Sequence, residues 1–258
     1  ALLLDGGKIA AVRLKHDLPN YGVFDEKRVF AAGPLPGPVN FRDVRLGVMI
    51  CEDMWQSEVA ECLQESGAEI LVVLNGSPYA LDKWDQRLHL AVERVTETRL
   101  PMVYVNQVGG QDELVFDGDS IVVGSDGRLL GRSGQFEPEL LVVDLDLPAA
   151  TERMPDPDER FEGVRIRRTV ISSEPFPAYD ARPVVHAERL SRHEEIWTAL
   201  VTGLRDYVAK NGFTSVLLGM SGGIDSTLVA AIAVDALGPE RVFGVSNPSE
   251  WSTEHSRS

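Results

Sequence analysis

The sequence of 258 residues has little cysteine, a shortage of positive charge and no long hydrophobic run. Its two cysteines, Cys51 and Cys62, are too few for a disulfide-stabilised scaffold and fit a reducing compartment, so we expect a cytoplasmic protein. The 25 Lys and Arg residues against 40 Asp and Glu give a net charge of −15, which argues against general attraction to nucleic acid or to anionic membranes. No apolar run approaches the roughly 20 residues that cross a bilayer.

What remains is an ordinary globular composition, with 43% hydrophobic and 25% charged residues. The length allows one large domain or two ordinary ones. The chain begins at Ala1 without a signal-peptide pattern and stops in a polar run at Ser258. We therefore expect a fragment of a longer protein.

Residues 1–147 alternate short β-rich runs with polar turns, and this rhythm predicts a layered α/β sandwich. The turn at Asp5-Gly6-Gly7 predicts a hairpin, and Gly67 is placed to end a helix. We expect strands over 2–4, 9–12, 44–50, 70–74, 102–106, 114–116, 121–123 and 140–143, and helices over 57–66 and 82–99.

Residues 148–186 are rich in proline and charge, which predicts an extended connector. Phe161, Ile166, Phe176 and Tyr179 could dock on a neighbouring surface.

Residues 187–258 form the third region. The spacing of apolar residues predicts a helix that ends at Asn211-Gly212, followed by strands over 216–218 and 242–245 with a helix over 224–237 between them. A strand, a helix and a second strand in this order predict the start of a doubly wound parallel sheet. So few strands leave apolar faces uncovered, and we expect this region to be poorly stable alone.

Cys51 directly follows the apolar run 47–50 and precedes Glu52 and Asp53. A turn from a strand into a helix exposes a sulfur, and the helix N-terminus favours its thiolate. The alternative is that Cys51 is a small buried hydrophobe, which is the more frequent fate of a lone cysteine and our reading of Cys62.

The segment from Lys15 to Glu26, taken with Ile50-Cys51-Glu52-Asp53, resembles the nitrilase-type carbon–nitrogen hydrolases. The form is the one found as the glutaminase half of glutamine-dependent NAD synthetases. The resemblance implies an α-β-β-α sandwich with Cys51 as nucleophile, Lys15 stabilising the oxyanion and Glu26 in support. Attack on an amide requires a soft nucleophile and a fixed positive charge near the developing oxyanion. Without the resemblance, Lys15 and Glu26 read as surface residues.

The same resemblance implies that Tyr21, Ser77, Lys83 and Arg87 hold the glutamine substrate. Charges of both signs suit an amino acid with its own ammonium and carboxylate. Lys83 and Arg87 also lie four residues apart on the expected helix, where both could simply be solvated. The polar stretch 106–118 is a further match, and we expect it to be a loop that lines the pocket.

The general base of this family is a glutamate well before the lysine, whereas only Asp5 is acidic ahead of Lys15. We therefore expect the base to lie outside these residues and the 258 residues alone not to hydrolyse glutamine efficiently.

A second constellation follows the strand expected over 216–218, where a glycine-rich loop opens a helix. Backbone amides and the helix dipole favour a phosphate at such a place. The alternative is a glycine turn with a helix cap. The pattern resembles the pyrophosphate loop of N-type ATP pyrophosphatases, and the resemblance assigns it Ser221, Gly222, Gly223, Asp225 and Ser226. A carboxylate there fits Mg²⁺ or a brace for the loop.

The flanks at 204–208, 210–213 and 245–249 also resemble NAD synthetases, although Asn247 and Trp251 depart from the usual Met and Tyr. The resemblance implies that ammonia released from glutamine amidates deamido-NAD at the expense of ATP, giving NAD, AMP, pyrophosphate and glutamate. It further implies ATP and Mg²⁺ as cofactors and a homo-oligomer.

Three divisions are therefore expected: a glutaminase domain over 1–147, a connector over 148–186 and the N-terminal part of a synthetase domain over 187–258. Two rival hypotheses remain open. One is a stand-alone amidase with an unrelated tail, which would need no ATP. The other is a non-catalytic scaffold, which the missing base would favour.

Overall fold

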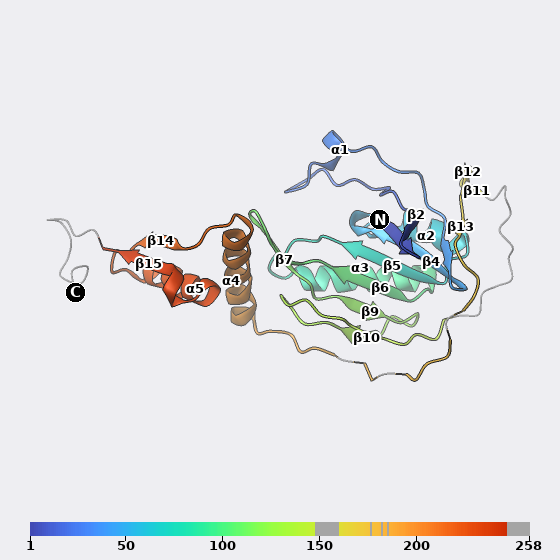
Figure 1. Ribbon diagram of the computed structural model, residues 1–258. Coiled ribbons are helices and arrows are strands. Elements are labelled where there is room, and N and C mark those ends of the chain that lie inside the picture. Colours follow the sequence, from blue (N-terminus) through green and yellow to red (C-terminus); the bar gives the residue numbers. More distant parts are fainter. Residues whose placement is uncertain (148–159, 176, 182, 185, 247–258) are drawn as a thin grey trace.

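The structure is a computed structural model that describes residues 1–147, 160–175, 177–181, 183–184 and 186–246. Phe176, Asn247 and Trp251, on which sequence expectations fell, lie outside the described residues. Figure 1 shows a broad body built around one sheet, from which helix α4 and the elements after it project beside strand β7.

The body is centred on a seven-stranded sheet in the order β10-β9-β6-β5-β4-β3-β13. The strands are β3 (Val39–Phe41), β4 (Val44–Ile50), β5 (Ile70–Asn75), β6 (Met102–Asn106), β9 (Ile121–Val123), β10 (Leu129–Arg132) and β13 (Thr169–Val170). β4, β5 and β6 are parallel, with Ile50 opposite Leu74 and Leu74 opposite Val105. The residues that follow these three strands therefore meet at one edge of the sheet.

Two helices cover one face of this sheet, α2 (Ser57–Glu65) and α3 (Lys83–Thr98). Each lies within a residue of its predicted bounds. Their apolar residues recur at helical spacing and pack on the sheet because burial removes that surface from water. The core includes Met49, Leu71, Val73 and Met102 from strands, and Val59, Leu63, Ala91 and Val95 from helices.

Within residues 1–147, the smaller elements are two hairpins and two single turns of helix. They are β1 (Leu2–Asp5), β2 (Lys8–Val12), α1 (Glu26–Val29), the 3₁₀ helix η1 (Cys51–Met54), β7 (Val108–Gln111) and β8 (Leu114–Asp117). The hairpin β1–β2 was predicted. The strand predicted over 114–116 is β8. The rest of the stretch 106–118 was expected to be a loop, and this was wrong, because β7 pairs with β8 as an antiparallel hairpin.

The strand expected over 140–143 is absent. Leu140 is 87% exposed, and the segment after it runs as an extended chain over β10. A Cβ on Gly131 of β10 would lie 2.7 Å from a methyl carbon of Val143 and 3.7 Å from one of Leu141. These apolar side chains thus cover a strand instead of forming one, and the sequence analysis missed β10 itself.

The described part of the segment 148–186 contributes to the body. It holds a short hairpin, β11 (Arg160–Phe161) with β12 (Val164–Arg165), and then β13 at the sheet edge beside β3. Phe161 and Ile166 are buried in the main core, as expected, whereas Tyr179 is exposed. Residues 148–159 lie outside the description.

The third region has the predicted order of elements. They are α4 (Arg192–Lys210), β14 (Val216–Gly219), α5 (Ile224–Leu237), the 3₁₀ helix η2 (Pro239–Arg241) and β15 (Val242–Val245). β14 and β15 pair in parallel, with Val216 opposite Val242. Ser191 caps α4, because its side chain accepts from the backbone of Glu194.

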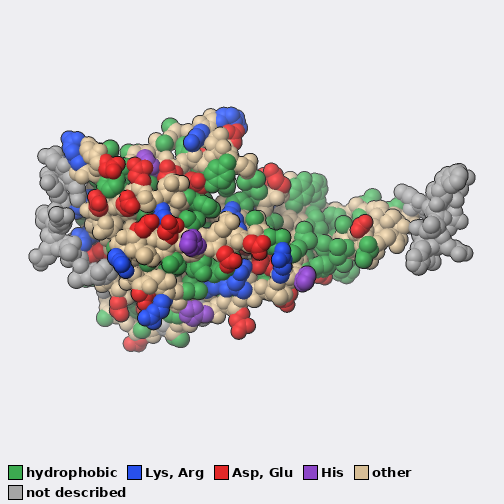
Figure 2. Space-filling model, turned by 180° about the vertical axis from the view of Figure 1, so that it is seen from behind, with side chains coloured by type: hydrophobic (Ala, Val, Ile, Leu, Met, Phe, Trp, Pro, Cys, Tyr) green, Lys and Arg blue, Asp and Glu red, His purple; other side chains and the backbone are tan. Residues whose placement is uncertain are grey.

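Apolar side chains of this region remain exposed, as expected: Leu217 is 71% exposed and Ile224 83%. Figure 2 shows hydrophobic side chains gathered over this narrow part of the molecule. None of the described helices combines the length and the apolarity that crossing a bilayer requires.

Helix α4 joins the third region to the body through the hairpin β7–β8. The Asp206 carboxylate accepts a 2.7 Å hydrogen bond from the Gly110 backbone N–H, and Lys210 Nζ donates to the Gly110 carbonyl at 2.5 Å. A Cβ at Gly110 would lie 3.2 Å from both Asp206 Cβ and Gly203 Cα. Glycine at position 110 therefore allows the hairpin to lie directly on the helix.

Candidate active site

Cys51 lies at the carboxyl end of β4, where the chain turns into η1. Its φ of +48° is unusual for a residue with a side chain, so the surrounding contacts must hold this turn. Burial raises the pKa of the Cys51 thiol, while the Lys15 ammonium and the Gly76 backbone N–H act in the opposite direction. Cys51 is thus a partly buried thiol with a cation and a hydrogen-bond donor beside it.

Lys15 and Glu26 form an ion pair beside this thiol. Lys15 Nζ donates to the two carboxylate oxygens of Glu26 at 2.7 and 2.8 Å, and the side chains are 15% and 25% exposed. The pair brings together residues 11 positions apart on a segment with little regular structure. Lys15 is thereby held as a charged group near the sulfur, rather than free at the surface.

The thiol opens into a cavity of about 560 Å³ at the edge where β4 and β5 end. Its lining residues are Tyr21, Phe24, Cys51, Glu52, Trp55, Gln56, Ser77, Ala80, Leu81, Lys83 and Gln86. The cavity thus brings together Cys51 and three of the four residues expected to hold glutamine. It is large enough for a small amino acid.

Charges of opposite sign face this cavity. The Tyr21 hydroxyl donates to the two Glu52 carboxylate oxygens at 3.0 and 2.8 Å, and burial together with Glu52 raises the pKa of Tyr21. Lys83 Nζ donates to the Pro78 carbonyl at 3.2 Å, and burial lowers the pKa of Lys83. Sequence reasoning did not assign Glu52 a role, although its position directly after Cys51 was the available signal.

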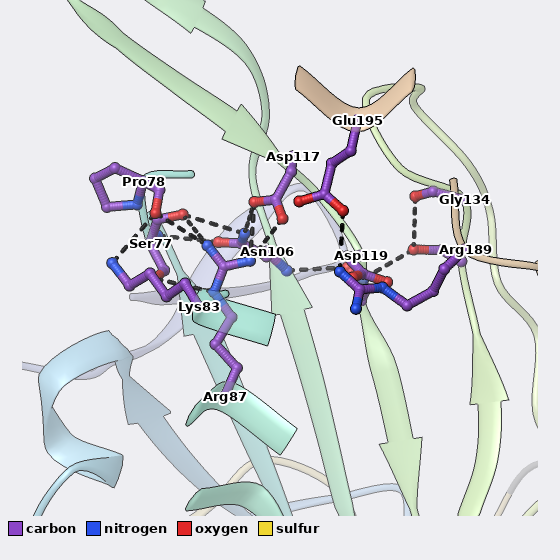
Figure 3. Close-up of polar contacts among 12 residues, drawn as sticks. Ser77, Pro78, Lys83, Arg87, Asn106, Asp117, Asp119, Gly134, Arg189 and Glu195 are labelled. Atoms are coloured by element: carbon purple, nitrogen blue, oxygen red, sulfur yellow. Dashed lines mark hydrogen bonds and ion pairs between the residues drawn. The ribbon is translucent and has the colours of Figure 1, made fainter. Parts of the chain in front are cut away.

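Arg87, the fourth expected glutamine residue, does not line the cavity. Figure 3 shows its guanidinium group among Ser77, Pro78 and Asp117, where Nη1 donates to both Asp117 oxygens at 2.8 Å. Nη2 donates to the Ser77 and Pro78 carbonyls, and Nε donates to Ser77 Oγ at 3.2 Å. All three guanidinium nitrogens donate to protein atoms, so Arg87 braces the cavity wall at Ser77 and Pro78.

The stretch 106–118 was expected to line the pocket, and it does not. Only its two ends approach the wall: the Asn106 side chain accepts from the Ser77 backbone N–H at 3.0 Å, and Asp117 binds Arg87. The hairpin between these ends turns away from the cavity toward helix α4. The expectation failed because the backbone of the stretch pairs with itself as β7 and β8. Its polar composition does not reveal this pairing.

The glycine-rich loop lies between β14 and α5, as expected. Ser226 Oγ donates to the Gly223 carbonyl at 3.0 Å, and Ser221 Oγ lies 3.2 Å from Ser226 Oγ. Gly222 has a φ of +77°, which a side chain would strain, and Gly223 caps the 14-residue helix α5. The loop residues Ser221, Gly222, Gly223 and Asp225 are exposed, so the loop can receive an anion.

The described residues contain no group of three or more His, Cys, Asp or Glu side chains that could hold a metal ion. Asp225 is the sole carboxylate in the loop 219–226. Mg²⁺ commonly takes one or two protein carboxylates and completes its six oxygens from phosphates and water. A single carboxylate in a glycine-rich loop would fit that mode and fits no preformed metal cage.

Comparison with known families decides the class of the protein. The model of the carbon-nitrogen hydrolase family matches residues 1–153, which is more than half of the chain. The chain belongs to the carbon–nitrogen hydrolase family. The family is the one on which the resemblance around Lys15 and Cys51 rested, and it carries the nitrilase-like fold. The model of the NAD synthase family matches residues 196–258 of this carbon–nitrogen hydrolase.

Curated relatives align with nearly the whole chain, across both of these parts. The glutamine-dependent NAD(+) synthetase of Rhodobacter capsulatus is 42% identical over 254 residues, which cover 98% of this chain and 41% of the relative. That of Aquifex aeolicus is 42% identical over 257 residues, covering 97% of this chain and 45% of the relative. This hydrolase therefore spans less than half the length of these relatives.

A solved structure extends the likeness to three dimensions. The glutamine-dependent NAD+ synthetase of Acinetobacter baumannii, in complex with adenosine diphosphate, aligns with a TM-score of 0.78 at 36% identity. The alignment covers 99% of this chain and 43% of that one. The predicted fold class, nitrilase-like and followed by the start of a synthetase domain, is confirmed.

Proposed function

We propose that this chain supplies the glutaminase part and the start of the synthetase part of a glutamine-dependent NAD synthetase. The observation that carries the proposal is one cavity lined by Cys51, Tyr21, Ser77 and Lys83 with Lys15 beside the sulfur, on a chain that also holds a glycine-rich loop at the N-terminus of α5. The divisions expected from the sequence, 1–147, 148–186 and 187–258, belong to this proposal.

In the first half-reaction, Cys51 Sγ attacks the side-chain amide carbon of glutamine. The Lys15 ammonium stabilises the negative oxygen of the tetrahedral intermediate, because a charge fixed beforehand needs no reorganisation when the oxyanion forms. The thiol proton is transferred to the amide nitrogen, and collapse of the intermediate then breaks the carbon–nitrogen bond, releases ammonia and leaves a glutamyl thioester on Cys51. Water then cleaves the thioester, which gives glutamate and frees the thiol.

The two ends of the substrate's amino-acid group match the two charges in the cavity. Lys83 faces the α-carboxylate and Glu52 the α-ammonium, with Tyr21 and Ser77 offering hydroxyl groups. Arg87 acts indirectly, by holding Ser77 and Pro78 in place. Both carboxylates near the sulfur, Glu26 and Glu52, are already engaged by Lys15 and Tyr21.

In the second half-reaction, the carboxylate of deamido-NAD attacks the α-phosphorus of ATP, and ammonia then displaces AMP to give NAD. The backbone N–H groups of Ser221, Gly222 and Gly223 and the N-terminus of α5 hold the departing pyrophosphate. Ser226 supplies a hydroxyl donor. Asp225 would give Mg²⁺ one ligand, and the phosphates would give it others.

The contacts between the two parts favour this joint function over an amidase with an unrelated tail. Asp206 and Lys210 of α4 bind Gly110 of the hairpin β7–β8, whose ends brace the cavity wall. An ordered cavity with its charges in place also weighs against a scaffold that has lost its chemistry. A cytoplasmic location, suggested by two free thiols, and a homo-oligomer remain parts of the proposal.

The test compares nitrogen sources in the full-length gene product. Cys51→Ala and Lys15→Met should abolish NAD formation from glutamine and retain it from ammonium salts, because only the first half-reaction uses these groups. Gly223→Val should impair NAD formation from both sources, since a side chain there would crowd the phosphate. Loss of both activities in Cys51→Ala, or unimpaired ATP turnover in Gly223→Val, would contradict the proposal.

A further inference from the structure

Asp53 is a buried carboxylate that the proposed chemistry does not use. Its side chain is fully enclosed and does not line the cavity. It accepts three hydrogen bonds from backbone N–H groups. Oδ1 accepts from His16 at 2.9 Å and from Asp17 at 2.8 Å, and Oδ2 accepts from Ile50 at 2.9 Å.

The three donors come from the two segments that carry the proposed reacting groups. His16 directly follows Lys15, and Ile50 directly precedes Cys51. The segment around Lys15 belongs to no helix or strand, so it gains no support there from regular secondary structure. The same segment also binds β4 through a 2.7 Å hydrogen bond from Arg13 Nε to the Val48 carbonyl. That bond lies two residues before Lys15 and three residues before Cys51.

We propose that Asp53 is a positioning residue that fixes the Lys15 ammonium beside the Cys51 sulfur by binding the backbone next to each of them. The inference rests on the function proposed above and identifies the group that assembles its cation and its nucleophile. A carboxylate suits this role, because its two oxygens can accept several N–H groups from different directions at once. An amide cannot, because its NH₂ group would face an N–H donor.

The test measures the alkylation of Cys51 by iodoacetamide as a function of pH, in the full-length protein, with labelled peptides quantified by mass spectrometry to separate Cys51 from Cys62. The rate follows the thiolate, so its midpoint reports the pKa of the thiol. Among the described residues, several ionisable side chains interact electrostatically with this thiol. They include Lys15, Tyr21, Glu26, Glu52, Lys83 and Tyr104.

Asp53→Asn should raise the midpoint, because a loosened Lys15 favours the thiolate less. Opposite charges within 4–6 Å shift a pKa by about 1–3 units, so we expect a rise of about one unit and alkylation about tenfold slower below the midpoint. The direction in which the midpoint shifts separates this mechanism from a direct electrostatic effect of the Asp53 charge on the thiol. Removing a buried negative charge without moving Lys15 would make the thiolate more favourable and would lower the midpoint.

A double-mutant cycle shows whether Asp53 acts through Lys15. Lys15→Met should raise the midpoint by itself, and Asp53→Asn should add nothing in that background. Glu69→Gln is the matched control: Glu69 is also a buried carboxylate, it accepts from the Arg45 backbone N–H at 2.8 Å, and it lies at the opposite end of β4. This control should leave the midpoint unchanged.

Each failure has a different meaning. An unchanged or lower midpoint in Asp53→Asn, or an equal rise with and without Lys15, would overturn the role of Asp53. An unchanged midpoint in Lys15→Met would overturn the proposed active site itself. Should Asp53→Asn not fold, hydrogen exchange of the unmodified protein decides: the amides of His16 and Asp17 should be protected, and exchange at the unprotected rate would refute the contacts.

Discussion

The ion pair between Arg87 and Asp117 offers the sharpest prediction about stability. Their side chains are only 2% and 5% exposed, and both Asp117 oxygens accept from Arg87 Nη1 at 2.8 Å. Asp117→Ala would leave a buried guanidinium without its counter-charge. Breaking a buried pair in this way costs about 3–5 kcal/mol, because the remaining charge stays out of water. For a chain of this size, that loss lowers the melting temperature by about 6–20 °C.

The assay is urea unfolding of the full-length protein and the Asp117→Ala variant, followed by circular dichroism. Asp126→Ala is the matched control, because its pair with Arg128 is exposed, with side chains 51% and 83% accessible. That control should lose less than about 1 kcal/mol. Replacing both partners by apolar residues, Arg87→Met with Asp117→Leu, should recover part of the loss. A loss below about 1 kcal/mol in Asp117→Ala would refute the reasoning.

Three further predictions follow from other parts of the molecule. Gly110→Val should weaken the packing of α4 on the hairpin β7–β8, which limited proteolysis after α4 would detect as faster cleavage; an unchanged rate would argue against this contact. Glu52→Gln should raise the KM for glutamine by about tenfold and leave the KM for ammonia unchanged, since one charged hydrogen bond contributes about 1.5–3 kcal/mol; equal effects on both would count against its place in the glutamine site. Stability should fall as pH rises above about 10, because burial raises the pKa of Tyr104 in the folded state and the unfolded chain then releases protons first. Urea midpoints at pH 8 and 10.5 measure this fall, and Tyr104→Phe should reduce it; an equal fall in that variant would remove Tyr104 as its cause.

The regular elements could be predicted from sequence because their periodicity is local. Helices α2 and α3 carry apolar residues at helical spacing, and β4, β5 and β6 are continuous apolar runs between turn signals. β7 and β10 are short, contain glycine and are held by pairing with a neighbouring strand, so local pattern did not reveal them. The segment 140–143 showed the opposite error: the side chains of Leu141 and Val143 cover β10, but the segment does not pair with it.

Parts of the candidate site could be predicted for a different reason. Cys51, Lys15 and the loop at Gly222 were singled out through a resemblance to known families, without which Lys15 read as a surface residue. The burial of Arg87 could not be read from the sequence, since the same spacing on α3 fits a solvated arginine. Asp53 was equally hidden, because its role depends on backbone groups of His16 and Asp17, which leave no mark in the sequence.

The most direct measurement is the identification of the group that takes up the glutamyl moiety. The full-length protein is mixed with isotopically labelled glutamine, quenched in acid within a turnover and digested for mass spectrometry. We predict label on the peptide that contains Cys51, lost in Cys51→Ala and sensitive to hydroxylamine, as a thioester is. Glutamine consumption without label on that peptide, or label on Cys62 instead, would contradict the role of Cys51 as the nucleophile.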